Sequence, residues 1–447
     1  MFTGLPLWAQ CLFSLTLAVI AVVQVWNLAL WVIAAKNQPP EHDDTPLGES
    51  DFLWVFVVPA LNEERTIADS VSRLVQMRCS QRRILVIDDG SEDATPEVLA
   101  TLREDHPELV VLRRDPPNAR LGKAAALNDA YRFVCARLAD SSWADPGHDR
   151  VVFAVIDADG RLDPDCPEVL SARFADPRVA GVQVRVDIYN DNTPLTWCQD
   201  VEFSVYGWLY QAARSAMGVA GMGGNGQFNR LSALTDVDEG SGPWRDRLTE
   251  DQDIGMRFIE AGWRNGHDNT VSVSQQGVPN LRRLLRQRTR WAQGNLQAMQ
   301  HITLLRHAHL GFFAAFDQLA ALLLPLVQLL VGVSLASSLY LAVARGFSLV
   351  PGTWLLIAVF YTVGFGSMVL GCSTRYGRSP AAFAKGLITA NAYVAYTWTI
   401  WPVLTRALWR QLRRETGWAK TAREVVATTG TPPETPGDLH PGEATGY

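Results

Sequence analysis

Residues 151–160 read VVFAVIDADG, an uninterrupted apolar run that ends in two carboxylates separated by one residue. A short run without polar alternation is typical of a strand that is buried on both faces of a parallel sheet. Residues 53–58 form a second run of this kind, which Pro59 ends. We therefore expect residues 151–156 and 53–58 to be inner strands of one sheet.

Strand and helix patterns alternate around these two runs. The pattern predicts further strands at residues 83–87 and 109–112, and helices at residues 64–77, from about residue 94, and at residues 123–138. Such alternation predicts an α/β domain with a doubly wound parallel sheet. In sheets of this class ligands bind at the carboxyl ends of the strands. Polar residues at those ends are the first candidates for a site.

Acidic residues follow two of the predicted strands. Asp88 follows residues 83–87, and Asp157 and Asp159 follow residues 151–156. A carboxylate after the first strand can accept hydrogen bonds from a ribose or a base. We expect one carboxylate of the Asp157–Asp159 pair to face a nucleotide and the other a metal. Mg²⁺ or Mn²⁺ bound by one or two carboxylates and diphosphate oxygens fits this pattern, and solvated turns remain the alternative.

Two features between these strands and residue 249 suit an anionic sugar ligand. Lys123 begins a predicted helix, where its charge opposes the helix dipole and indicates a nearby anion, although a surface lysine is the alternative. Gly224, Asn225, Gly226 and Gln227 form a glycine-rich stretch that would let the backbone approach a sugar closely. A flexible loop explains this stretch equally well.

The cluster Thr249-Glu250-Asp251 precedes a helix predicted at residues 251–261. Carboxylates at this place suit general-base chemistry. The alternative is structural, because Thr249 can cap the helix and acidic residues stabilise its first turn.

A basic amphipathic segment covers residues 281–309 and contains Gln287, Arg290 and Trp291. Arginine binds phosphate groups well, and an indole offers a flat face to a sugar. The segment also has the composition of a helix that lies on anionic lipid, and we expect it to serve both purposes.

Apolar segments flank the charged middle of the chain. Residues 7–35, 314–344 and 351–372 are long enough to span a bilayer. Residues 386–404 are a fourth candidate, weakened by Asn391 and Pro402, and they either cross the membrane or lie re-entrant or at its interface.

Bulk composition excludes some classes of protein. The net charge of −6 argues against a general nucleic-acid binder. The six scattered cysteines lack the spacing of a zinc site and suit reduced thiols facing the cytosol.

We accordingly divide the chain into six parts. These are an N-terminal transmembrane helix (1–36), a linker (37–50), a cytosolic nucleotide-sugar domain (51–280), amphipathic interfacial helices (281–310), a C-terminal transmembrane region (311–410), and a basic tail (411–447) that we expect to be disordered from residue 428.

Taken in order, these signatures resemble the membrane-embedded family 2 glycosyltransferases. That family includes the synthases of cellulose, chitin, hyaluronan and poly-N-acetylglucosamine, and bacterial enzymes that glycosylate lipids. The resemblance covers about residues 51–299 and the flanking spans. It implies a GT-A fold, a UDP-sugar donor, Mg²⁺ or Mn²⁺, and a multi-pass protein of the cell membrane whose catalytic domain is cytoplasmic.

The resemblance also implies roles for individual residues. The nucleotide-sugar donor would be bound by Pro59, Ala60, Asn62, Glu63, Asp88, Lys123, Asp157, Gln287 and Arg290. Asp159 would bind the metal, Asp251 would be the general base, and Glu250 is the next candidate for that role. The acceptor would contact Trp291 and the stretch Gly224, Asn225, Gly226 and Gln227, which differs from the acceptor-end motifs of cellulose and hyaluronan synthases.

Three functions remain open at this point. The first is a processive synthase that adds sugars to a growing polysaccharide with inversion at the anomeric carbon. The second uses the same chemistry once, on a membrane lipid. The third is a non-catalytic membrane scaffold, which the intact acidic residues disfavour.

Overall fold

The computed structural model describes residues 5–36, 47–306, 310–346 and 354–415. The predicted disorder of residues 428–447 therefore lies outside the described residues.

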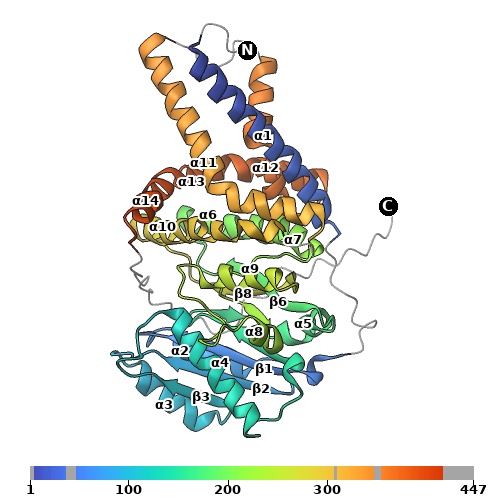
Figure 1. Ribbon diagram of the computed structural model, residues 1–447, viewed down its shortest axis with the longest axis vertical. Coiled ribbons are helices and arrows are strands. Elements are labelled where there is room, and N and C mark those ends of the chain that lie inside the picture. Colours follow the sequence, from blue (N-terminus) through green and yellow to red (C-terminus); the bar gives the residue numbers. More distant parts are fainter. Residues whose placement is uncertain (1–4, 37–46, 307–309, 347–353, 416–447) are drawn as a thin grey trace, which may run out of the picture.

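A mixed eight-stranded sheet forms the centre of the fold, in the order β3-β2-β1-β4-β7-β6-β8-β5 (Figure 1). The strands are β1 (Leu53–Ala60), β2 (Arg82–Asp88), β3 (Leu109–Arg113), β4 (Val151–Val155), β5 (Arg161–Leu162), β6 (Val179–Ile188), β7 (Gln227–Arg230) and β8 (Arg264–Gln275). The four predicted strands are present as β1 to β4, and they pair in parallel.

The sheet is mainly parallel, as expected, but one half of it is mixed. Strand β7 runs antiparallel to both β4 and β6, and β5 runs antiparallel to β8, whereas β6 and β8 are parallel. Strand β7 follows the glycine-rich stretch directly, so the chain enters the sheet next to β4 from the end where β4 stops. This arrangement brings the glycine-rich stretch to the carboxyl end of β4.

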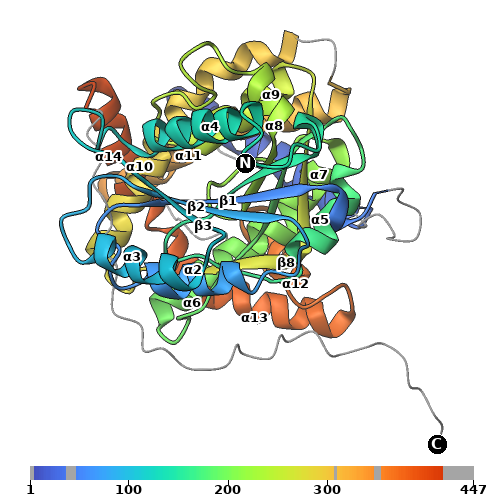
Figure 2. The same ribbon diagram turned by 90° about the horizontal axis from the view of Figure 1, so that it is seen from below.

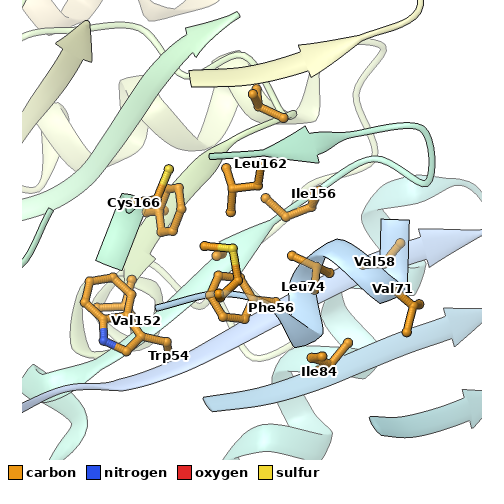
Figure 3. Packing of buried hydrophobic residues seen from close by; sticks show 14 of the residues in the cluster. Trp54, Phe56, Val58, Val71, Leu74, Ile84, Val152, Ile156, Leu162 and Cys166 are labelled. Atoms are coloured by element: carbon orange, nitrogen blue, oxygen red, sulfur yellow. The ribbon is translucent and has the colours of Figure 1, made fainter. Parts of the chain in front are cut away.

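Helices cover both faces of the sheet (Figure 2). They are α2 (Ile67–Val75), α3 (Thr95–Asp105), α4 (Lys123–Ala139), α5 (Cys166–Phe174), α8 (Leu231–Asp236) and α9 (Glu250–Glu260). Successive residues of β1 point to opposite faces: Trp54 and Phe56 pack in the cluster with α2 and α5, and Val55 packs in the cluster with α4 and α9. Figure 3 shows the first cluster, in which Leu74 of α2 lies over the strands.

A second group of helices lies between the sheet and the apolar helices (Figure 1). It comprises α6 (Pro194–Val205), a π-helical turn (Tyr206–Gln211), α7 (Ala212–Met217), α10 (Leu281–Ala298) and a 3₁₀ segment (Met299–Arg306). The helix predicted within residues 281–309 is therefore present as α10.

The apolar helices are α1 (Leu7–Ala34), α11 (Phe312–Arg345), α12 (Trp354–Thr374), α13 (Pro380–Thr397) and α14 (Ile400–Leu412). By length and composition, α1 and residues 312–344 of α11 can cross a membrane. Both extend away from the sheet at the same end of the molecule (Figure 1). Helix α12 coincides with the third predicted span, and its residues 365–374 form a shorter apolar stretch.

The fourth candidate span is not one helix. Helix α13 ends at Thr397 and α14 begins at Ile400, so residues 386–404 are interrupted at Trp398. Pro402 explains the break, because a proline inside a continuous helix would clash with the carbonyl four residues earlier, here that of Trp398. In α14 the same proline lies in the first turn, where its missing N–H is tolerated.

A buried ion pair joins the apolar helices to the rest of the fold. Arg214 of α7 donates to the Asp317 carboxylate of α11 at 2.7 Å, and the Trp26 indole of α1 donates to the same carboxylate at 3.0 Å. The Asp317 side chain is almost fully buried. Three segments that are distant in sequence therefore meet at one carboxylate.

We expect Asp317→Ala to destabilise the protein by about 3 kcal/mol, because it leaves the buried Arg214 charge without its partner. Thermal unfolding in detergent measures the loss. The double variant Arg214→Met/Asp317→Leu is the control, since it removes both charges and should regain most of the stability. If Asp317→Ala unfolds at the same temperature as the wild type, the ion pair contributes nothing to the stability of the protein.

Candidate active site

One cavity of about 930 Å³ connects the sheet with the apolar helices. Its polar end lies where β1 and β4 stop. This end is lined by Pro59, Ala60, Glu63, Asp89, Arg120, Lys123, Asp157, Glu250 and Asp251. Its apolar end is lined by residues of α11, α12 and α13, among them Leu322, Leu324, Phe365, Met368, Val394 and Trp398. Gln287, Arg290 and Trp291 of α10 line the cavity as well.

Lys123 lies among carboxylates at the polar end. Its ammonium is 2.7 Å from Asp157 Oδ1 and 4.0 Å from Glu250 Oε1. Burial acts to lower the pKa of Lys123, but the charges of Asp157, Glu250 and Asp251 outweigh burial and raise it. As expected, Lys123 is the first residue of its helix, α4. Its charge is compensated by acidic side chains from two parts of the site, the end of β4 and the start of α9.

Glu250 and Asp251 begin α9 and form a coupled acidic pair. Burial, and then the charge of Asp251, raise the pKa of Glu250 to about 7. Burial also raises the pKa of Asp251, while the nearby Lys123 opposes this effect. A carboxylate with a raised pKa is a stronger base than an ordinary one, which suits proton removal from a hydroxyl.

The glycine-rich stretch contacts this acidic pair through its backbone. A Cβ atom on Gly224 would lie 2.7 Å from Asp251 Oδ2, and the φ of Gly224 is +80°. Two buried glutamines hold the preceding turn: Gln211 exchanges hydrogen bonds of 2.6 and 3.0 Å with the backbone of Gly221, and Gln183 accepts the N–H of Gly223 at 2.9 Å. The close approach predicted from the glycines is therefore to the carboxylate of Asp251.

The other members of the stretch have different surroundings. The Asn225 amide oxygen accepts the backbone N–H of Asp157 at 3.0 Å, and Asn225 lines the cavity. Gly226 packs against Val273, where a Cβ would come within 2.6 Å, and Gln227 is buried in β7. Gly224, Gly226 and Gln227 do not line the cavity, so the acceptor role predicted for these three residues gains no support.

The two residues of the aspartate motif after β4 also differ. The Asp157 carboxylate lines the cavity beside Lys123. Asp159 is 4% exposed, accepts the N–H of Gln276 at 3.2 Å and does not line the cavity. Among the described residues no group of three histidine, cysteine or acidic side chains can hold a metal. A cation bound through one carboxylate and a diphosphate requires no such group, so Asp157 fits a metal that binds together with the donor.

Two residues predicted for the nucleoside end, Asp88 and Asn62, do not line the cavity. Asp88 is buried beneath the cavity, where it pairs with Arg113 and accepts the N–H of Ser91 at 2.9 Å. Its neighbour Asp89 lines the cavity and pairs with the buried Arg114. Successive residues at a strand end face opposite ways, which explains why only one of this pair lines the cavity.

The remaining predicted residues at this end are Asn62 and Glu63. Asn62 links two loops, since its N–H donates to Ser91 Oγ at 2.9 Å and its side-chain oxygen accepts the N–H of Glu92 at 2.8 Å. Glu63 lines the cavity. Asn62 thus supports the turn that presents Pro59, Ala60 and Glu63.

Helix α10 brings its motif to the middle of the cavity. Arg290 donates to the carbonyl of Leu248 at 3.3 Å, next to the acidic pair. Burial raises the pKa values of Glu250 and Asp251, and the positive charge of Arg290 opposes that rise. The Arg288 guanidinium lies 4.1 Å from the centroid of the Trp291 ring and donates to Glu202 at 2.7 Å. Trp291 is thereby fixed between an ion pair and the cavity.

The sequence did not indicate Asp89, Gln183, Gln211 or the Glu202–Arg288 pair. The Asp88-Asp89 doublet was a usable signal, because one of two adjacent acids at a strand end must face the ligand side. The glutamines carry no local signal, since their role depends on β6 and the π-helical turn meeting the glycine-rich stretch.

The site combines acidic side chains at strand ends, a lysine that lies among them, and a helix toward the apolar helices that carries an arginine and a tryptophan. This combination defines a nucleotide-sugar transferase. Comparison with known proteins agrees. Residues 55–218 match the model of Glycosyl transferase family 2, and residues 152–369 match that of Glycosyl transferase family group 2. The chain belongs to the family 2 glycosyltransferases.

Two curated relatives point to different products. The chain is 30% identical over 300 residues to beta-monoglucosyldiacylglycerol synthase of Trichormus variabilis, an alignment that covers 66% of this chain and 59% of the relative. It is 27% identical over 247 residues to poly-beta-1,6-N-acetyl-D-glucosamine synthase of Staphylococcus aureus, which covers 55% of each. The chain thus spans between half and three fifths of these relatives.

A solved structure shares the fold. The mannosyltransferase PcManGT from Pyrobaculum calidifontis, solved with GDP-Man and Mn²⁺, aligns over 90% of this chain and 99% of its own with a TM-score of 0.58 and 18% identity. This likeness confirms the GT-A-type fold.

We expect Gly224→Ala to lower kcat about 100-fold, because the methyl group would displace the Asp251 carboxylate and misplacement of a catalytic group by 1 Å has effects of this size. Steady-state transfer assays measure the change. Gly223→Ala is the matched control, since its Cβ would make only an ordinary contact, 3.4 Å from Gln183. Equal rates for both variants would show that a methyl group on Gly224 does not displace the Asp251 carboxylate.

The raised pKa values predict that activity falls as the pH drops below about 7, because protonation then removes the negative charge of the Glu250–Asp251 pair. In Glu250→Gln the neighbouring negative charge is gone, Asp251 ionises more easily, and the acid limb should move to lower pH. Profiles of kcat/KM against pH test this. Glu97→Gln on the surface of α3 is the control, and an acid limb unchanged in Glu250→Gln would contradict the coupling.

Proposed function

We propose that this protein is an inverting β-glycosyltransferase that moves a sugar from a UDP-sugar to the hydroxyl group of a membrane lipid. One observation carries the proposal: a single cavity runs from Asp157 and Asp251 to the apolar side chains of α11, α12 and α13. A charged donor fits the polar end, and acyl chains fit the apolar end.

The residues of the polar end divide the work of a single displacement. Asp251 removes the proton of the acceptor hydroxyl as its oxygen attacks the anomeric carbon. Arg290, which lies beside the acidic pair, stabilises the negative charge of the departing diphosphate. Asp157 would hold Mg²⁺ or Mn²⁺, which would neutralise further charge on the diphosphate when bound.

The charges toward the apolar end favour an uncharged lipid. Arg214 is paired with Asp317, and Arg288 is paired with Glu202, so both cations that line this part of the cavity already have acidic partners. A phosphate-bearing lipid would need a free cation there, whereas a diacylglycerol hydroxyl needs none. The relative from Trichormus variabilis is named for a glucosyldiacylglycerol product, which agrees with this choice.

A second candidate is elongation of a polysaccharide, the function first expected from the sequence. Trp291 on the cavity favours it, because an indole can stack on the acceptor sugar. The relative from Staphylococcus aureus is named for such a product.

One ion pair supports a proposal for the membrane topology. Arg375, in the loop between α12 and α13, is 2.5 Å from Asp200 of α6, so this loop lies on the side of the catalytic domain. The loop is basic, which favours the cytoplasmic side for both. We propose a multi-pass protein of the cell membrane with its catalytic domain in the cytoplasm.

The test incubates purified protein with radiolabelled UDP-glucose or UDP-N-acetylglucosamine and one of three acceptors: diacylglycerol, a polyprenyl phosphate or a soluble oligosaccharide. We expect label in the lipid phase with diacylglycerol alone. Excess EDTA should abolish the transfer. Asp251→Asn should also abolish it, yet leave UDP binding by calorimetry unchanged.

Three other outcomes have clear meanings. Label in the oligosaccharide would favour the second candidate, and label in the polyprenyl phosphate would exclude the preference for an uncharged lipid. Substantial transfer by Asp251→Asn would reassign the base, with Glu250 the next candidate.

A further inference from the structure

The apolar end of the cavity reaches the surface of the protein. Two of the residues that line it are large, apolar and exposed: Leu324 of α11 is 46% exposed, and Trp398 after α13 is 61% exposed. A side chain that both lines a cavity and contacts the outside lies at its rim. The cavity therefore has a mouth at Leu324 and Trp398.

The mouth lies beside helices that suit a bilayer. Leu324 lies within the apolar stretch of α11 that can cross a membrane. Trp401, three residues after Trp398, packs against that stretch, since a Cβ on Gly332 would lie 2.7 Å from its ring. The break between α13 and α14 is therefore held against α11, and the opening lies beside the apolar stretch that can cross a membrane.

We propose that Leu324 and Trp398 form a lateral portal through which the acceptor lipid enters the cavity from the bilayer. This inference rests on the proposed lipid-glycosylating function and specifies how the substrate reaches the site. Acyl chains that move sideways from lipid into an apolar cavity are never exposed to water, so entry needs no desolvation of the chains.

The side chains along the path match such a ligand. Behind the rim, Leu322, Met368 and Val394 offer apolar contacts. Further in, the path reaches Trp291 of α10, and the acidic pair lies at the polar end. A lipid that enters head first would place its head group at the catalytic carboxylate and leave its acyl chains against the apolar side chains near the rim.

Trp398 suits the rim in its chemistry as well as in its position. Indole rings concentrate at membrane interfaces because they have an apolar body and one polar N–H. The helix break leaves Trp398 outside both neighbouring helices, at the place where a lipid head group would pass. A continuous helix over residues 386–404 would not create this opening.

The test compares Leu324→Trp with Leu326→Trp in nanodiscs that contain diacylglycerol. Both leucines are exposed on α11 to nearly the same extent, 46% and 45%, but only Leu324 lines the cavity. We expect Leu324→Trp to lower kcat/KM for diacylglycerol about tenfold, with the KM for the UDP-sugar unchanged, because a larger side chain obstructs acceptor entry alone. Leu326→Trp should match the wild type.

A second pair of variants removes bulk from the rim. Trp398→Ala should change the preference for acyl-chain length, whereas Trp409→Ala, exposed on α14 and absent from the cavity lining, should not. UDP binding by calorimetry serves as the check that each variant is folded.

The outcomes separate the portal from the proposed function. Wild-type kinetics in both Leu324→Trp and Trp398→Ala, with lipid glycosylation intact, would overturn the portal and leave the function standing. A wild-type protein that glycosylates no lipid would overturn both. Equal losses in Leu324→Trp and Leu326→Trp would mean that bulk on α11 disturbs the helix, which also overturns the portal.

Discussion

The ammonium group of Lys123 among three carboxylates is the interaction on which this active site depends. Asp157 arrives from the end of β4, Glu250 and Asp251 arrive from the start of α9, and one positive charge lies among them. Without it, three clustered acids would repel one another. The lysine therefore joins the donor-binding part of the site to its base, and its charge opposes the rise that burial causes in the pKa of Glu250 and of Asp251.

The second constraint is that donor and acceptor prefer different solvents. A nucleotide sugar is charged and an acyl chain is apolar, so a transferase for both must place its base at a boundary. Helix α10 forms that boundary here, since Arg290 faces the acidic pair and Trp291 contacts the Glu202–Arg288 pair. The aromatic and ionic contacts of one helix thus lie between the polar end of the cavity and its apolar end.

The sequence alone predicted the elements whose signal is local. The inner strands, the helix at Lys123 and the helices of the two long apolar segments follow from periodicity and length. The antiparallel β7 was not predictable, because its direction depends on how the glycine-rich stretch returns to the sheet. Asp89 was missed in favour of Asp88, since which of two adjacent acids faces a cavity depends on strand orientation. Gln183 and Gln211 were missed because they act on backbone groups far away in the sequence.

The carboxylate of Asp317 has a consequence for how the protein is made. Its partners Trp26 and Arg214 are both synthesised before it. When α11 leaves the ribosome, the first membrane helix and α7 of the catalytic domain are already available to receive its acid. An unpaired carboxylate in an apolar helix is costly to place in lipid. The acid of α11 therefore has its partners only where α1 and α7 both lie against that helix, so the position of α11 depends on two segments that precede it in the chain.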